Sequence, residues 1–353
     1  MNKGMTTKAK ISAPLAAAVL LTACGHSTTS SAPMNGSALL INGAGATFPY
    51  PIYAKWFDTY HRRHPDVQIN YQSIGSGGGI RQLLEGTVDF GASDMPMTDE
   101  QLEKAPKKIL HFPTVLGADV PTYNLPGLSR DLKFTQAALA GIFLGRINRW
   151  NDPALTAANP GVPLPAQDIV VVHRSDGSGT TFVWTDFLSK VSPEWKSRVS
   201  ANTSVNWPTG LGAKGNEGVS GLVKQTPNSI GYVELIYAIQ NKLAFGLVQN
   251  AAGNFVKAST ASVTAAAAGA SGSMPDDFRV SITNAPGAWA YPISSFTWLL
   301  IPEHIANTTK CQNLKGFLQW MLTDGQGMVE SLYYAPLPHA VATQEMSQIS
   351  QIH

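Results

Sequence analysis

From Ala38 onward, short β-prone runs alternate with stretches whose apolar residues recur at helical spacing, and this alternation restricts the fold more than any other feature. Strands that alternate with helices predict an α/β protein with a mainly parallel or mixed sheet. The length of 353 residues suits about two domains. The predicted strands are 38–43, 67–74, 87–93, 169–173, 229–234 and 296–301, and the predicted helices are 49–64, 78–86, 135–143, 180–190 and 310–322. A further helix should follow Thr98, which opens a capping box with Gln101.

Residues 1–23 have the pattern of a secretory signal peptide. Three lysines precede an apolar run over 11–21, which is too short to span a bilayer. The run ends in Leu21-Thr22-Ala23-Cys24, which resembles a bacterial lipobox and implies cleavage before Cys24 and lipid attachment to that cysteine. The alternative is an N-terminal apolar helix that stays on the chain. We expect an exported protein, held at a membrane in the periplasm or cell envelope by lipid on Cys24.

Residues 24–37 are small and polar and show no periodicity, which predicts a flexible, lipidated tether. Lipid on Cys24 would leave the second cysteine, Cys311, without a disulfide partner in the chain. Cys311 lies in 310–322, where apolar residues recur at helical spacing, so we expect a buried and inert thiol. A redox function therefore has little support.

The charge balance argues against a nucleic-acid partner. The chain has 25 Lys and Arg against 23 Asp and Glu, a formal charge of +2, and loss of residues 1–23 would leave 22 against 23. Nucleic-acid binders present a strongly basic face, whereas this chain has one short basic cluster at 61–64. The eight histidines show no metal-binding spacing and no paired catalytic carboxylates stand out, so we expect neither a metal centre nor a cofactor.

Three glycine-rich turns each follow a predicted strand and open a predicted helix, at 43–48, 75–79 and 176–180. A helix N-terminus offers unpaired N–H groups and the positive end of the helix dipole, and glycine lets an anion approach the backbone. One such turn is more often only a tight connection, but three in one chain favour an anion site. The turns also supply hydroxyl groups, on Thr47, Ser76, Ser178 and Thr180.

None of these turns is a nucleotide-binding loop or a nucleophile elbow. The first lacks the third glycine of G-x-G-x-x-G, none ends in G-K-[ST], and no serine lies in G-x-S-x-G.

Two charged residues end predicted strands nearby. Arg174 could present its guanidinium fork to a tetrahedral anion while Asp176 holds it, and Asp94 lies where ligands bind in open α/β sheets. A solvent-exposed arginine and an ordinary turn aspartate are the alternatives.

Seven blocks that keep their order over residues 40–340 carry a family resemblance. They are GAGATFPYPIYAKW, YQSIGSGGGIRQLL, VDFGASDMPM, HFPTV, RSDGSGTTFV, WPTGLGAKGNEG and IGYVE. Together they resemble the exported phosphate-binding proteins of bacterial phosphate ABC importers. The resemblance implies a type II periplasmic-binding-protein fold, with two α/β lobes, two crossover strands and a ligand cleft between the lobes. Lobe I would be 38–116 plus 292–353 and lobe II 117–291, with crossings near 116–124 and 288–295.

The resemblance also implies a site, a ligand and partners. Asp176 would support Arg174, and the turn GSGGG departs slightly from the family, where a second serine is common. Phosphate keeps a proton that an ionised Asp94 can accept, whereas sulfate has none, so Asp94 would set selectivity. The implied partners are inorganic phosphate and a permease with a cytoplasmic ATPase, and the implied state is a monomer without enzymatic activity. The implied phosphate contacts are Thr47 and Phe48 through the backbone, Ser76, Asp94, Arg174, Ser178, Gly179 and Thr180.

Three other readings remain open. A secreted phosphatase would use the same anion pocket but needs a nucleophile with a base, or a metal cluster, and the sequence shows neither. A receptor for another oxyanion, such as sulfate, molybdate or tungstate, would gain nothing from Asp94 because these anions carry no proton to share. A purely structural role would leave Arg174 and Asp94 without purpose.

Overall fold

Strand β1 (Leu39–Gly45) lies between two parallel partners, β2 (Val67–Ser73) and β3 (Phe90–Ser93). Helices α1 (Tyr50–Arg63) and α2 (Ser76–Leu84) make the connections between these strands. Because the three strands run in parallel, their carboxyl ends lie at one edge, where both helices begin. The predicted strands and helices of this region are therefore confirmed to within a few residues.

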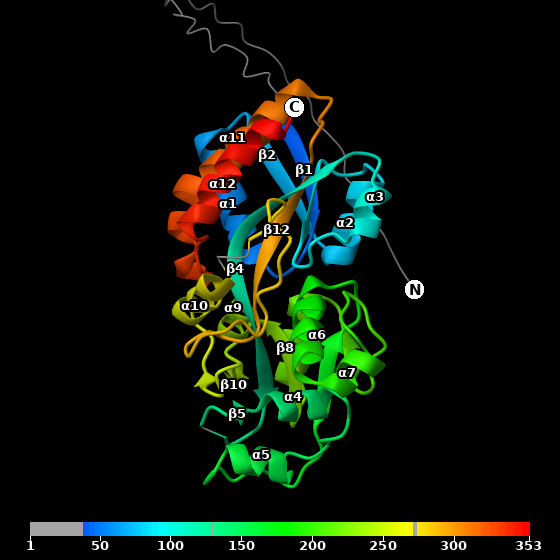
Figure 1. Ribbon diagram of the computed structural model, residues 1–353, viewed down its shortest axis with the longest axis vertical. Helices are drawn as coiled ribbons and strands as arrows, with labels where there is room; N and C mark the ends of the chain where they lie inside the picture. The colour runs from blue at the N-terminus through cyan, green and yellow to red at the C-terminus, as the bar shows by residue number, and fades with distance from the viewer. Residues whose placement is uncertain (1–37, 129, 271–273) are drawn as a thin grey trace, which may run out of the picture. The chain divides into compact units, whose positions relative to one another are not determined.

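The long strand β4 (Ile109–Asn124) joins the two halves of the main sheet. Up to Ala118 it pairs antiparallel with β12 (Ser294–Pro302), and from Asp119 it pairs antiparallel with β8 (Ser229–Glu234). The chain thus passes from one half of the sheet to the other within a single strand. Figure 1 shows β4 and β12 running between the upper and lower parts of the molecule.

The second half of the sheet continues from β8 to β6 (Val170–Arg174) and β7 (Leu211–Ala213), all parallel. The strand order is β2-β1-β3-β12-β4-β8-β6-β7, with β9 (Ala244–Phe245) paired to β4. This computed structural model describes residues 38–128, 130–270 and 274–353. The predicted signal peptide and tether, with Cys24, lie outside the described residues. The mixed sheet with helices and its two halves joined through β4 confirm the predicted α/β, two-lobe fold.

Strand β4 was not among the strands predicted from periodicity. Nearly all of its residues are buried, so it shows no apolar–polar alternation, and Pro113, Gly117 and Pro121 are residues that usually interrupt strands. The register slips by one residue at Thr114, opposite the step between Thr297 and Trp298. Such a bulge lets a central strand contain proline.

The remaining helices frame this sheet, and four of them, α3, α4, α6 and α11, match predicted helices. Thr98 caps its helix as expected: its Oγ1 accepts the Gln101 N–H at 3.2 Å, and Gln101 Oε1 accepts the Thr98 N–H at 3.0 Å. A small second sheet contains β5 (Lys133–Phe134), β10 (Leu247–Gln249) and β11 (Phe255–Val256). The other helices are α3 (Asp99–Glu103), α4 (Gln136–Phe143), α5 (Pro153–Ala158), α6 (Gly179–Val191), α7 (Pro193–Arg198), α8 (Gly215–Gln225), α9 (Leu235–Gln240), α10 (Thr260–Ala270), α11 (Thr308–Trp320) and α12 (His339–Gln348), with helical turns at Met321–Gly325, Gln326–Met328, Glu330–Leu332 and Ile349–Gln351.

Aromatic side chains of α1 and α11 form much of the core beside β1. Phe57 and Tyr60 each lie 5.3 Å from Phe317 between ring centroids, and Trp320 adds a fourth ring. Cys311 of the same helix is buried and free, which confirms the expected buried thiol. Among the described residues, no helix is both long enough and apolar enough to cross a membrane.

Helix α12 buries an acid that makes the stability of the fold depend on pH. Both carboxyl oxygens of Glu345 lack a hydrogen-bond partner among the described residues, and burial raises its pKa well above the usual range. The folded chain therefore binds this proton more tightly than the unfolded chain. Stability contributed by the proton is present at low pH and is lost as pH rises above the unfolded-state value of about 4.3.

We expect Glu345→Gln to flatten this pH dependence. The amide does not titrate, so any stability lost through its altered hydrogen bonding is the same at every pH. Relative to the wild type, the free energy of unfolding of the variant should therefore increase from pH 5 to pH 8. The gain should be at most about 1.4 kcal/mol per pH unit. Urea unfolding across this range measures it, with exposed Glu330→Gln as the control. A difference that does not change with pH would show that folding does not raise the pKa of Glu345.

Candidate anion-binding site

The three glycine-rich turns converge where the carboxyl ends of the strands in both halves of the sheet face each other. The second and third turns touch directly, because Gly77 N–H donates to the Gly177 carbonyl at 2.9 Å. Helices α2 and α6 begin at these turns, and α1 begins just after Thr47 and Phe48. Three helix N-termini thus point toward one buried region, as the sequence predicted.

Arg174, at the end of β6, is fixed by a bidentate ion pair. Its Nε and Nη2 donate to the two carboxylate oxygens of Asp176 at 2.8 and 2.6 Å, and its side chain is 1% exposed. Asp176 also accepts the Gly215 N–H at 3.0 Å. Burial alone would lower the pKa of Arg174 and raise the pKa of Asp176. The bonds between the two residues outweigh burial, so the pKa of Arg174 is raised and the pKa of Asp176 is lowered. The pair stays ionised and leaves Nη1 to donate at 3.3 Å to Thr180, toward the turn that opens α6.

Two hydroxyl groups from opposite halves of the sheet meet at one amide. Asn216 Nδ2 donates to Thr47 Oγ1 at 2.7 Å and to Thr180 Oγ1 at 3.2 Å. Both hydroxyls accept from Asn216, so their own hydrogens are free to be donated elsewhere. All three residues are buried. This places the hydroxyls of the first and third turns beside the Arg174 guanidinium.

Asp94, at the end of β3, brings a proton acceptor to the site. Its Oδ1 accepts from Thr297 Oγ1 at 2.7 Å and its backbone N–H donates to Ser76 Oγ at 3.2 Å. Its Oδ2 is buried and has no partner among the described residues. Burial raises the pKa of Asp94 to about 7, although the Thr297 hydroxyl and the charge of Arg174 act to lower it. A carboxyl with this pKa can accept or hold a proton near neutrality.

Gly179, the first residue of α6, lies against the Asp94 carboxyl. A Cβ atom added at Gly179 would lie 2.4 Å from Ser76 Oγ and 2.5 Å from Asp94 Oδ2. No side chain fits at this position in the present arrangement. The α6 N-terminus therefore reaches the Asp94 and Ser76 side of the site only because residue 179 has no side chain.

Gly179→Ala is therefore expected to weaken anion binding without unfolding the chain. Overpacking of this size costs about 1–3 kcal/mol, so affinity should fall roughly 10- to 100-fold. Gly221→Ala is a matched control, because Gly221 lies in α8 and a Cβ there meets nothing within 4 Å. Calorimetric titration measures both variants, and equal affinities would contradict the close approach of α6.

Phe48 and Ser178 complete the set of predicted residues. Tyrosine hydroxyls hold the carbonyls of the first turn: Tyr237 donates to the Thr47 carbonyl and Tyr334 to the Phe48 carbonyl, each at 2.6 Å. Ser178 caps α6, with its Oγ accepting the Thr181 N–H at 3.0 Å. Each predicted residue therefore lies in or directly beside one buried cluster.

Two further carboxyls lie behind the site on the strands that join the two halves. Asp119 of β4 is opposite Glu234 of β8, and both are fully buried. Burial raises the pKa of each well above its usual range, and the nearby charge of Asp94 raises both further. Both carboxyls therefore retain their protons to higher pH than exposed acids do, which limits the negative charge that they place behind the site.

Sequence reasoning missed several residues that build the site. Asn216 lies within one of the blocks that carry the family resemblance, but nothing in its local sequence marks a side chain that joins two turns. Thr297 and Asp119 look like ordinary residues of buried strands, and Tyr237 follows the last block. Their roles depend on contacts between segments that are far apart in the chain, such as the 203 residues between Asp94 and Thr297.

The assembled groups suit a partly protonated tetrahedral anion. One buried guanidinium, three helix N-termini and several hydroxyls supply positive potential and donors, and Asp94 supplies one acceptor. Within the described ranges, no group of three or more His, Cys, Asp or Glu is arranged to hold a metal ion.

Comparisons with known proteins agree with this geometry. A family model described as a PBP superfamily domain matches residues 23–325. The chain is 46% identical over 314 residues to the phosphate-binding protein PstS of Xylella fastidiosa, covering 89% of this chain and 85% of that protein. It is 47% identical to PstS of Haemophilus influenzae, covering 87% and 92%. A solved structure, a high affinity periplasmic phosphate-binding protein bound with phosphate, superposes with a TM-score of 0.71 at 23% identity, covering 88% and 93%.

Proposed function

The chain belongs to the PBP superfamily and within it to the PstS phosphate-binding proteins, and we propose that it captures inorganic phosphate and delivers it to an ABC importer. One observation carries the choice of ligand: a buried acceptor without a partner, Asp94 Oδ2, shares a site with the buried guanidinium of Arg174. This pairing fits an anion that is negative and still carries a proton.

The proposed contacts follow from the groups that are free to donate. Arg174 would face the phosphate oxygens with its Nη1 edge, while Asp176 fixes its other edge. The hydroxyls of Thr47 and Thr180 would donate to the same oxygens, because Asn216 already occupies their acceptor side. The remaining proposed contacts are Ser76, Ser178, and the backbone N–H groups of Phe48 and Gly179.

Delivery requires partners and a location that we include in the proposal. We propose a place in phosphate transport, with permease subunits and a cytoplasmic ATPase as partners. We propose that the chain acts outside the cytoplasm as a monomer, held by lipid on Cys24, because residues 1–24 resemble a lipoprotein signal. Lobe I would comprise 38–116 plus 292–353 and lobe II 117–291, a division supported by the change of pairing partner after Ala118.

We further propose that the chain is not an enzyme. Ser178 and Ser76, the serines nearest to the site, accept backbone N–H groups, and neither has a histidine or carboxylate base bonded to it among the described contacts. A phosphatase would need such a base. Turnover of a chromogenic phosphate ester tests this directly, and any turnover that Arg174→Ala abolishes would favour the phosphatase.

Calorimetric titration of residues 25–353, unfolded and refolded to remove bound ligand, tests the main proposal. We expect tight 1:1 binding of phosphate and no heat with sulfate. No response to phosphate, or a stronger response to sulfate or molybdate, would overturn the proposal in favour of another ligand.

A further inference from the structure

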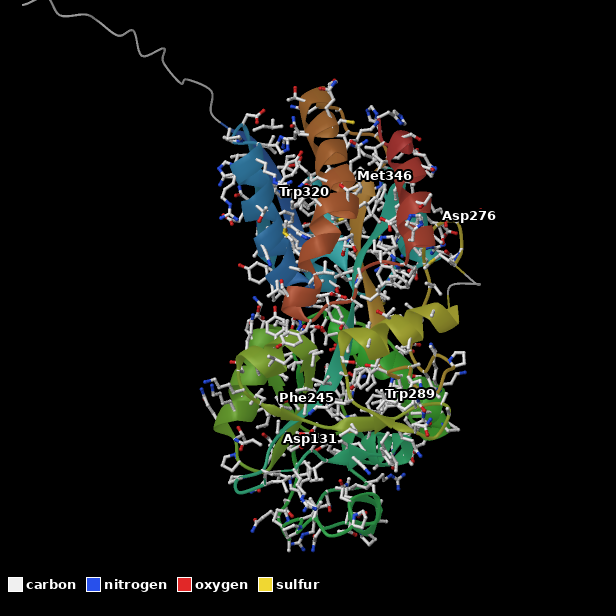
Figure 2. The ribbon with its side chains drawn as sticks, turned by 90° about the vertical axis from the view of Figure 1, so that its left-hand side faces the viewer. Asp131, Phe245, Asp276, Trp289, Trp320 and Met346 are labelled. Carbon is white, nitrogen blue, oxygen red and sulfur yellow. The ribbon has the colours of Figure 1, made fainter. Side chains whose placement is uncertain are left out.

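We propose that residues 277–283, here called the strap, position the two sides of the phosphate site against each other, with Arg279 as the positioning residue. In the chain, the strap lies between α10 and β12. The inference deepens the proposed function and rests on it, because it concerns how long the site retains phosphate. Figure 2 shows Asp276 at the level of α12 in the upper part and Trp289 in the lower part, so the chain runs between these parts here.

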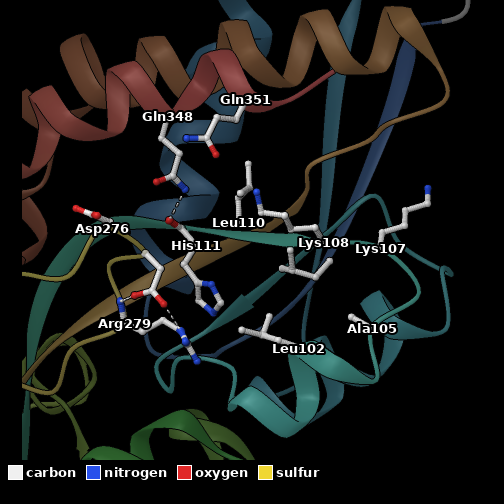
Figure 3. A pocket seen from close by; sticks show the side chains of 12 residues that line it. Leu102, Ala105, Lys107, Lys108, Leu110, His111, Asp276, Arg279, Gln348 and Gln351 are labelled. Atoms are coloured by element: carbon white, nitrogen blue, oxygen red, sulfur yellow. Dashed lines mark hydrogen bonds and ion pairs between the residues drawn. The ribbon is translucent and has the colours of Figure 1, made fainter.

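The first end of the strap is hydrogen-bonded to the loop that follows Asp94. Arg279 Nη1 donates to the Met97 carbonyl at 3.0 Å and to Asp99 at 2.7 Å. The N–H of Met97 is held from the other side by His111 Nε2 at 3.0 Å. Both polar groups of the Met97 backbone are thus occupied. Figure 3 shows His111 and Arg279 together on the wall of one pocket.

A buried aromatic residue fixes the same end of the strap. Phe278 is fully buried, and its backbone adopts a left-handed conformation with φ of 58°, which an aromatic residue rarely tolerates. Its carbonyl accepts from Trp298 Nε1 at 3.0 Å. Trp298 lies opposite Ser93 in the β3–β12 pair, next to Thr297, which holds the Asp94 carboxyl. The strap is therefore attached to the two elements that orient Asp94.

The second end of the strap is bonded to α6. Lys190 Nζ donates to Ser281 Oγ at 2.8 Å and to Thr283 Oγ1 at 2.7 Å. The hydroxyls of Ser281 and Thr283 donate in turn to Asp186, which pairs with Lys190 at 3.0 Å. Helix α6 begins at Gly179, beside the anion site, and is 13 residues long. A rigid helix thus links this end of the strap to the donors at residues 178–180.

The strap therefore connects the Asp94 loop to the helix that faces it across the site. Any movement that separates Gly179 from Asp94 must either break the Arg279 contacts or move the strap away from α6. The Arg279 side chain is only 24% exposed, so its bond to the Met97 carbonyl is partly shielded from water, although Asp99 is 81% exposed. Breaking these contacts should speed the release of phosphate and leave its entry into an open site unchanged.

The test is the release of ³²P-labelled phosphate from the full-length protein, chased with unlabelled phosphate. We expect Arg279→Ala to raise the dissociation rate roughly 3- to 10-fold and to change the association rate less than 2-fold. Arg146→Ala is the matched control, because Arg146 pairs with Glu194 within one half of the sheet. Arg279→Lys keeps one donor nitrogen but loses the Nε bond to Asp277 Oδ2 at 2.7 Å, so it should give an intermediate rate.

A second variant separates positioning from a general loss of stability. The double variant Ser281→Ala/Thr283→Val weakens the other end of the strap without touching Arg279, because it removes every hydroxyl contact to Lys190 and Asp186 and leaves only the Lys190 bond to the Thr283 carbonyl. Since either release detaches the strap, combining it with Arg279→Ala should raise the dissociation rate no further than the faster of the two alone. Additive effects, or an unchanged rate in Arg279→Ala, would overturn the inference. If the wild type itself binds no phosphate, the proposed function fails instead.

Discussion

Asp94→Asn is expected to lower the preference for phosphate over sulfate by roughly 10⁴-fold, the largest effect of any single change in this protein. In the wild type, the unpartnered Oδ2 can accept the proton that phosphate retains, and an ionised carboxylate repels sulfate, which has none. The amide of asparagine presents a donor or a weaker acceptor and carries no charge. Titrations of both anions at pH 8 give the ratio of the two dissociation constants.

The pH dependence of selectivity provides the control. Because burial raises the pKa of Asp94 to about 7, the empty site holds this proton increasingly as pH falls below 7. A protonated Asp94 can donate to sulfate, so discrimination by the wild type should weaken between pH 8 and pH 5. Asp94→Asn has no such group, so its ratio should change with pH only as far as phosphate itself titrates. A wild-type ratio that follows the same pH course as that of Asp94→Asn would show that Asp94 does not govern selectivity.

Arg174→Ala is expected to weaken phosphate binding roughly 10²- to 10³-fold. Removing one partner of a buried, hydrogen-bonded charge pair costs about 2–5 kcal/mol, and the loss here includes the charge-assisted contact to the anion. The guanidinium is almost fully buried and bound to Asp176 at two atoms, so water cannot easily replace it. Calorimetric titration with phosphate measures the change.

Two further variants show whether charge or shape matters at position 174. Arg174→Lys keeps the charge but loses the planar fork, so we expect it to recover only part of the affinity. Asp176→Asn should weaken binding less than Arg174→Ala, because the guanidinium remains but is less firmly held. Phosphate affinity that is unchanged in Arg174→Ala would place the anion elsewhere.

The sequence predicted those features of the structure that depend on residues close together in the chain. The alternation of strands and helices predicted most elements of the main sheet, and the three glycine-rich turns predicted where helix N-termini meet. Thr98 and Gln101 form the expected capping box because capping depends on residues three apart. In these places the physics acts over a few neighbouring residues, which a sequence displays directly.

The sequence could not reveal features that arise from contacts between distant segments. Strand β4 is buried along both halves of the sheet and contains two prolines, so neither periodicity nor composition distinguishes it. Asn216 bridges two turns from opposite halves, and Arg279 reaches Met97 across 182 residues of sequence. Each of these side chains acquires its role only when folding brings its partners to it.

The buried acids Asp119, Glu234 and Glu345 also change how the folded chain behaves in an electric field. Their formal charges count in the composition, yet burial makes all three retain protons to higher pH than exposed acids do. Over the pH range in which they stay protonated while exposed acids ionise, these three residues give the native protein less negative charge than the same residues would in the unfolded chain. They thereby add less electrostatic repulsion toward an anion than the sequence alone would indicate.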